Sequence, residues 1–182
     1  LPLTDEKRLV VDIGGGSTEF IIGRGYEALE RESLQVGCIA STLRFFEDGK
    51  ITSRRWKQAQ SEIAVELQQF GAHYRERGWS EAIGSSGTMK AIGGIVQASG
   101  WSDQGITAES LATLREALLR AGSTEQLSLP GLSSDRVGVI AGAPAWCSID
   151  ANSDGSRHPV ATANDVPEDR RRLRPGVGIG TS

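Results

Sequence analysis

The sequence has little of several things that would point to particular classes of protein. Its formal net charge is only −3 over 182 residues, which gives no electrostatic reason for nonspecific binding to nucleic acid or to a membrane surface. No apolar run approaches the roughly 20 residues that a membrane-spanning helix needs. We therefore expect neither a nucleic-acid partner nor an integral membrane segment.

Cysteine and methionine are also scarce. The two cysteines, Cys38 and Cys147, lie far apart and lack the spacing of metal ligands, so we interpret them as ordinary thiols in a reducing cytosol. Met89 is the only methionine, and the chain opens at Leu1. These features predict that the sequence is a piece of a longer protein.

The first half of the chain alternates between strand and helix patterns. Residues 8–13 and 19–23 read as short β-branched strands around a glycine turn, which indicates a hairpin. A third strand is expected over 27–36 and a short helix over 39–47. A long helix is expected over 53–77, with apolar residues at helical spacing: Trp56, Ile63, Leu67, Phe70 and Tyr74.

The long helix has clear start and stop signals, and the pattern continues beyond it. Ser53 is the expected N-cap. Residues 81–96 predict a strand, a glycine-serine turn and a helix, and residues 107–120 predict another amphipathic helix. We expect a short helical start over 133–141. Residues 143–182 show neither helical nor strand periodicity, so we expect disorder there, or a tail that is not native coding sequence.

A turn of small residues joins the first two strands, with a carboxylate on each side. Backbone N–H groups in such a turn can converge on an anion, and hydroxyl groups add further donors. Asp12 precedes the turn and Glu19 follows it, which suits a phosphate site in which a divalent cation separates phosphate from carboxylate. The alternative is a glycine-rich hairpin with solvated acids. The turn residues are Gly14, Gly15, Gly16, Ser17 and Thr18.

A second turn of the same kind opens the helix within 81–96. The N-terminus of that helix would point free N–H groups and the positive end of its dipole at an anion. The alternative is an ordinary helix start capped by Ser or Thr. Lys90, just inside the helix, is a candidate phosphate contact, whereas we interpret His73 as an ordinary residue of the long helix. The turn residues are Gly84, Ser85, Ser86, Gly87 and Thr88.

Four blocks carry a family resemblance. In order, they are VVDIGGGSTEF, RESLQVGCIASTLRFFEDGKIT, AIGSSGTMKAIG and LPGLSSDRVGVIAG. Together they resemble the exopolyphosphatase / guanosine pentaphosphate phosphohydrolase family from Leu1 to about Gly142. The DIGGGSTE block is highly specific to that family.

The resemblance implies a fold and a reaction. The fold is an α/β, ribonuclease-H-like domain of the actin-like ATPase superfamily, with a mixed sheet flanked by helices, and residues 1–142 would be the second of two such domains. The reaction is hydrolysis of the terminal phosphoanhydride of inorganic polyphosphate, or of guanosine pentaphosphate, with Mg²⁺ or another divalent cation. Asp12 and Glu19 would be the catalytic, metal-binding carboxylates, and the two turns would bind phosphate.

The resemblance also implies a setting for the domain. The family's first domain, which carries another phosphate loop and the glutamate usually assigned as the base, has no counterpart in this sequence. We therefore expect weak or no turnover from this chain alone. The implied full-length protein is a homodimer in the cytoplasm, with peripheral attachment at the inner membrane as an alternative.

Two other functions stay open. A nucleotide-dependent kinase or chaperone ATPase of the same superfamily shares the Asp-Gly-Gly-Gly turn, although Glu19 directly after GGGST favours the hydrolase. A non-catalytic polyphosphate-binding module is also chemically reasonable, since a nest of N–H groups with one metal ion can bind phosphate without hydrolysing it.

Overall fold

A mixed β-sheet forms the centre of the molecule. The computed structural model describes residues 5–142 and the backbone of 160–162. Within these residues the strand order is β3-β2-β1-β4-β5. The pairs β1–β2 and β2–β3 are antiparallel, whereas β1–β4 and β4–β5 are parallel. The strands are β1 (Arg8–Ile13), β2 (Thr18–Arg24), β3 (Glu27–Leu34), β4 (Glu81–Gly84) and β5 (Val160–Thr162).

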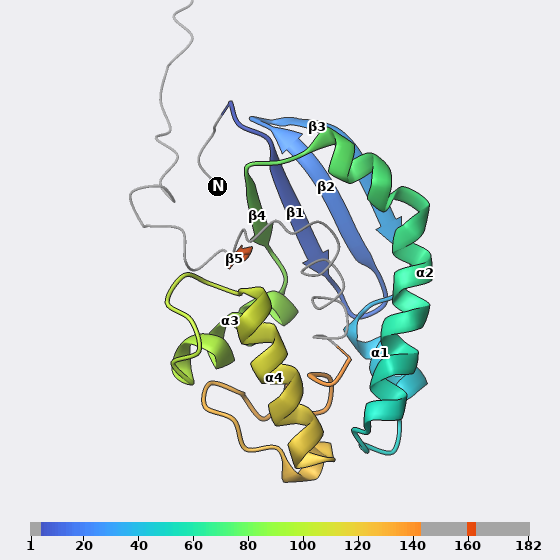
Figure 1. Cartoon of the computed structure of the whole chain (residues 1–182), viewed down its shortest axis with the longest axis vertical. Helices are drawn as coiled ribbons and strands as arrows, with labels where there is room; N and C mark the ends of the chain where they lie inside the picture. Colours follow the sequence, from blue (N-terminus) through green and yellow to red (C-terminus); the bar gives the residue numbers. More distant parts are fainter. Residues whose placement is uncertain (1–4, 143–159, 163–182) are drawn as a thin grey trace, which may run out of the picture.

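Helices flank this sheet (Figure 1). The long helix α2 runs beside β2 and β3, and α3 and α4 lie on the other side of the molecule, beyond the end of β4 (Figure 1). None of the helices in the described part of the chain has the length and apolar character that a membrane span needs. The helices are α1 (Cys38–Phe45), α2 (Ser53–Arg77), α3 (Gly87–Ala98) and α4 (Ala108–Ala121), with a 3₁₀ turn at Thr124–Gln126.

Part of the hydrophobic core lies between the α2 helix and one face of the sheet. The stripe expected from helical spacing is buried: Trp56, Ile63, Leu67, Phe70 and Tyr74. Phe70 packs its ring against that of Phe20 on β2, with ring centres 5.3 Å apart. The Tyr74 hydroxyl donates a hydrogen bond of 2.9 Å to the carbonyl of Phe20. Odd-numbered and even-numbered strand residues face opposite sides, so the neighbours of Phe20 on β2 point away from α2.

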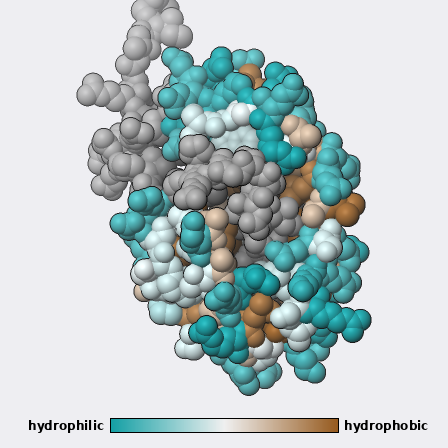
Figure 2. Space-filling view, viewed as in Figure 1, coloured by the Kyte–Doolittle hydropathy of each residue, from teal (hydrophilic) through white to brown (hydrophobic). Residues whose placement is uncertain are grey.

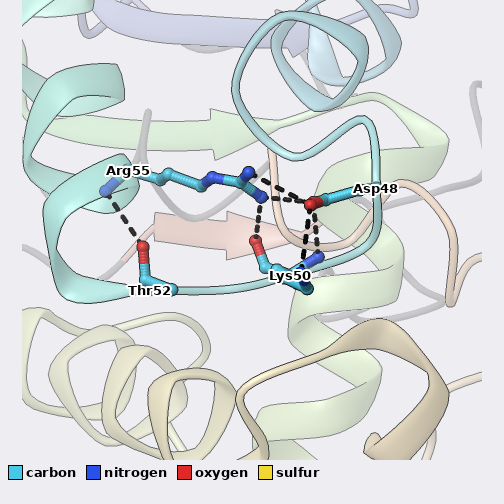
Figure 3. Close-up of polar contacts among 4 residues, drawn as sticks. All are labelled: Asp48, Lys50, Thr52 and Arg55. Atoms are coloured by element: carbon cyan, nitrogen blue, oxygen red, sulfur yellow. Dashed lines mark hydrogen bonds and ion pairs between the residues drawn. The ribbon is translucent and has the colours of Figure 1, made fainter.

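Asp48, in the connection between α1 and α2, pairs with both Arg55 and Lys50 (Figure 3). The Arg55 guanidinium donates to both carboxylate oxygens of Asp48 and to the carbonyl of Lys50, the latter at 3.1 Å. Thr52 is the N-cap of α2, because its hydroxyl accepts a hydrogen bond of 3.3 Å from the N–H of Arg55. The expected cap, Ser53, is instead the first residue of the helix.

Two segments differ from what the sequence predicts. Residues 133–141 form successive turns rather than a helix, and Gly138 lies in the middle of them, where glycine disfavours helix by about 1 kcal/mol relative to alanine. Within 143–182, the backbone of Val160–Thr162 pairs with β4 as β5, which departs from the expected lack of regular structure. The remainder of that segment lies outside the described residues.

The surface in view is largely hydrophilic, with small and separate hydrophobic patches (Figure 2). Among the described residues, the large apolar side chains that remain exposed are few: Tyr26, Ile39, Leu43 and Val65. Two of them, Ile39 and Leu43, lie four residues apart on α1. Ile39 extends over the first glycine turn, since its Cδ1 lies 2.9 Å from the position of a Cβ at Gly15.

Candidate functional site

The first glycine turn, between β1 and β2, is held against the start of α1. Its carbonyls accept the N–H groups that a helix leaves unpaired at its N-terminus: Cys38 donates to Gly14 at 2.9 Å, and Ile39 donates to Gly15 at 3.0 Å. Gly37 makes this approach possible. A Cβ there would lie 2.6 Å from the Gly15 carbonyl oxygen and closer still to that of Gly14. The turn is therefore tied to α1 through its backbone.

Asp12 and Glu19 lie directly opposite one another on the hairpin. They are Cα partners in the antiparallel pairing of β1 and β2, which places their side chains on the same face, with Cβ atoms roughly 5 Å apart. Phe20, next to Glu19, faces α2, so the two carboxylates lie on the opposite face of the sheet. Both side chains are partly buried.

The second turn meets the first at the same end of the sheet. The Ser85 hydroxyl donates a hydrogen bond of 2.7 Å to Asp12 Oδ2, and the Ser85 N–H donates to the carbonyl of Val11 at 3.1 Å. Thr88, in the first turn of α3, donates to the Cys38 sulfur at 3.3 Å. The site therefore lies at the carboxyl ends of the parallel strands β1 and β4, where open α/β sheets bind ligands.

The hydroxyl groups predicted to bind phosphate all have partners within the chain. Ser17 donates to Glu19 Oε1 at 2.6 Å, and the fully buried Thr18 donates to the carbonyl of Val36 at 2.8 Å. Ser86 caps α3 by accepting from the N–H of Met89 at 3.1 Å. With Ser85 and Thr88 also engaged, the backbone of the turns is the better source of donors.

Several backbone N–H groups in the turns are available to donate to a ligand. They include the N–H groups of Gly15, Gly16 and Gly87, which donate to no acceptor among the described residues. Gly16 and Gly87 are exposed, and Gly87 is the first residue of α3, where the helix dipole favours an anion. The predicted roles of the two turns in phosphate binding stay predictions, with the backbone rather than the hydroxyls as the expected donor set.

Arg136 is a basic residue that sequence reasoning did not place in the site. Its guanidinium lies against the N-terminus of α3, because Nη2 is 2.8 Å from the position of a Cβ at Gly87. It also pairs with Asp135, with 3.4 Å between Nε and Oδ2. A hydrogen bond from Ser133 and the charge of Arg136 lower the pKa of Asp135. In the sequence, this segment is singled out only by the LPGLSSDR block, which is part of the family resemblance.

Two other residues considered from the sequence can now be located. Lys90 is exposed in the first turn of α3. His73 is about half exposed on α2, with its Nε2 3.1 Å from Glu30 Oε2. Glu30 also accepts from Arg77 at 2.6 Å. The contacts of Glu30 with His73 and Arg77 link α2 to β3, on the sheet face opposite the Asp12 and Glu19 carboxylates.

The donor set suits a magnesium ion. Mg²⁺ commonly binds through one or two carboxylates and keeps several waters, with substrate phosphates completing its shell. Asp12 and Glu19 supply two carboxylates on one face. No group of three or more His, Cys, Asp or Glu side chains suited to a metal occurs within the described residues. Asp12 and Glu19 therefore fit a metal that is shared with a phosphate ligand, rather than one enclosed by protein.

Solved structures resemble this chain in fold. The Aquifex aeolicus PPX-GPPA enzyme superposes with a TM-score of 0.70 at 20% identity, covering 87% of this chain and 54% of its own. An exopolyphosphatase from Cytophaga hutchinsonii gives 0.65 at 21% identity, covering 82% of this chain and 51% of its own. These similarities confirm the expected α/β architecture of the actin-like ATPase fold, with a mixed sheet flanked by helices.

Sequence comparison gives the family. A curated protein of Haemophilus influenzae, described as "Putative exopolyphosphatase", is 38% identical over 134 residues, which are 74% of this chain and 42% of that protein. The chain thus spans less than half the length of that relative. The model of the Ppx/GppA phosphatase family matches residues 2–147, which include both glycine turns and both carboxylates. The chain belongs to the Ppx/GppA phosphatase family.

Proposed function

We propose that this chain provides the phosphate- and metal-binding wall of an enzyme that hydrolyses the terminal phosphoanhydride of inorganic polyphosphate or of guanosine pentaphosphate. The observation that carries the proposal is the meeting of two glycine turns around two carboxylates. Ser85 of the second turn is hydrogen-bonded to Asp12 beside the first turn, and Asp12 is paired with Glu19.

Each part of this wall has a role in the proposed reaction. Asp12 and Glu19 would hold a magnesium ion, which when bound offsets negative charge on the transferring phosphoryl group. The N–H groups of Gly16 and Gly87 and the guanidinium of Arg136 would orient the phosphate chain. The contact between α1 and the first turn keeps these groups in place before the substrate arrives, as electrostatic catalysis requires.

The base that activates water lies, in this proposal, outside the chain. Asp12 and Glu19 are both assigned to metal, and each accepts a serine hydroxyl, so neither is placed as a free proton acceptor. We therefore expect the chain alone to bind polyphosphate and to release little phosphate from it. A longer protein that supplies the other wall would complete the reaction.

A chimera tests the proposal. Residues 1–142 replace the matching region of the Haemophilus influenzae relative, and phosphate release from polyphosphate is measured with and without Mg²⁺. We expect Mg²⁺-dependent release that Glu19→Gln lowers at least about a hundredfold, as loss of a group that stabilises transition-state charge does. A matched control, Glu76→Gln on the exposed side of α2, should retain activity.

The same assay separates the alternatives. A folded chimera that hydrolyses ATP and leaves polyphosphate intact would favour a nucleotide-dependent ATPase. A chimera that binds polyphosphate and releases no phosphate would favour a non-catalytic binding module. Either result would contradict the proposed hydrolase.

A further inference from the structure

Four polar side chains form a row across the sheet, at right angles to the strands. Glu19 on β2 is the Cα partner of Asp12 on β1 and also of Ser33 on β3. Directly opposite residues in a sheet share a face, so Asp12, Glu19 and Ser33 lie on the same side. Ser85, which follows β4, extends the row beyond Asp12 through its hydrogen bond to that carboxylate. The two acids are thus flanked by a serine at either end.

The serines contact one oxygen of each carboxylate. Ser33 Oγ donates to Glu19 Oε1 at 3.2 Å, and Ser17 Oγ donates to the same oxygen at 2.6 Å. Ser85 Oγ donates to Asp12 Oδ2. Within the described residues, no donor is directed at Glu19 Oε2 or at Asp12 Oδ1. Each carboxylate therefore keeps one oxygen for a ligand from outside this network.

This arrangement has a consequence for Glu19. A glutamate on a strand has three rotatable side-chain bonds, whereas magnesium demands near-ideal octahedral geometry. A carboxylate held by two hydroxyl groups loses less conformational entropy when a metal binds. Ser17 lies only two residues from Glu19, but Ser33 comes from another strand, which fixes the carboxylate relative to the sheet.

We propose that Ser33 is a positioning residue, which orients Glu19 so that its second oxygen binds a divalent cation together with Asp12. For the role of the metal, the inference rests on the proposed function. Its test, however, measures metal binding in the absence of any substrate. Sequence reasoning placed Ser33 only within a strand. Groups that orient metal ligands affect metal affinity by about 10- to 100-fold, and because Ser33 is exposed we expect an effect near the lower limit.

The test is Mn²⁺ binding by the 182-residue chain, followed by electron paramagnetic resonance of the free ion. Ser33→Ala should weaken Mn²⁺ binding about tenfold. Ser33→Thr retains the hydroxyl on a residue that suits a strand, and it should restore affinity to within about threefold of wild type, since the donor to Glu19 is kept. Ser61→Ala, on the exposed side of α2, is the matched control and should leave affinity unchanged.

Thermal unfolding without metal separates positioning from folding. Ser33→Ala should unfold within a few degrees of wild type, because a single exposed hydrogen bond contributes about 1 kcal/mol or less. Equal Mn²⁺ affinity in wild type and Ser33→Ala would overturn the inference, and so would a Ser33→Thr variant as weak as Ser33→Ala. Absence of Mn²⁺ binding by the folded wild type would also overturn it.

The inference and the proposed function can fail separately. If Mn²⁺ binding depends on the Ser33 hydroxyl while the chimera releases no phosphate from polyphosphate, the inference stands and the hydrolase assignment fails. If the chimera is an active phosphatase while Mn²⁺ binding does not depend on the Ser33 hydroxyl, the hydrolase assignment stands and the inference fails.

Discussion

Gly37→Ala should separate the first glycine turn from α1. In the structure, the carbonyl oxygens of Gly14 and Gly15 lie where a methyl group at residue 37 would be placed, the latter at 2.6 Å. Both neighbours are backbone atoms, which cannot rotate away as a side chain can. The methyl group can be accommodated only if the turn, the start of α1 or both move.

The cost can be worked from these contacts. Inserting a methyl group into a closely packed site costs about 1–3 kcal/mol. The displacement also weakens the hydrogen bonds from the N–H groups of Cys38, Ile39 and Ala40 to the turn, each worth about 1 kcal/mol. We expect a loss of about 3 kcal/mol, which is a large part of the 5–15 kcal/mol that stabilises a typical domain.

Chemical denaturation and thermal unfolding measure this loss. A loss of 3 kcal/mol should lower the melting temperature by about 6–12 °C in a chain of this size. Gly16→Ala in the same turn is the matched control. A Cβ at Gly16 has no heavy atom within 4 Å, and its φ is not positive, so stability should change by less than about 1 kcal/mol. Equal stability of Gly37→Ala and Gly16→Ala would refute the predicted clash.

Three further predictions concern stability. The indole N–H of Trp56 is buried without a partner among the described residues. Trp56→Phe should therefore lower the free energy of unfolding by clearly less than the roughly 3–5 kcal/mol expected for a change to alanine. Urea denaturation measures both losses. The Arg55 hydrogen bonds, with the Lys50 N–H, lower the pKa of Asp48 from 3.8 to about 2. This contribution is present above pH 3.8 and is lost as the pH falls to about 2, so Asp48→Asn should flatten the pH dependence of the melting temperature in that window. A wild-type melting temperature that does not change with pH in that window would contradict this role of Asp48. Thr107 caps α4 through a hydrogen bond from the Ser110 N–H, so Thr107→Ala should cost about 1 kcal/mol; retained stability on denaturation would exclude a capping role.

Local patterns predicted much of the fold. Helical spacing identified the buried stripe of α2, and the β-branched runs around GGGST identified the hairpin of β1 and β2. The third strand was also expected, and it ends at Leu34, two residues before the predicted end. These features depend on neighbours in sequence, which is why periodicity and turn chemistry reveal them.

The contacts that build the site were harder to predict, since they join distant segments. Ser85 and Asp12, 73 residues apart, were both candidates, but nothing local indicated that one donates to the other. The approach of Arg136 to Gly87 and the alignment of Ser33 with Glu19 depend on strand register and on packing between helices. Patterns within a single sequence reveal neither the strand register nor the packing between helices. The turns at 133–141 show the reverse case, in which a local helix pattern does not survive a glycine at its centre.

The central claim is that Asp12 and Glu19 form a metal-dependent phosphate site with the two turns. Calorimetric titration of the chain with a short polyphosphate, in the presence and absence of Mg²⁺, tests it most directly. We predict binding that requires Mg²⁺ and weakens at least about tenfold in Asp12→Asn and in Glu19→Gln, while Asp103→Asn, in an exposed loop, binds as wild type does. Binding that is equally tight without Mg²⁺, or unchanged by both substitutions, would contradict the claim.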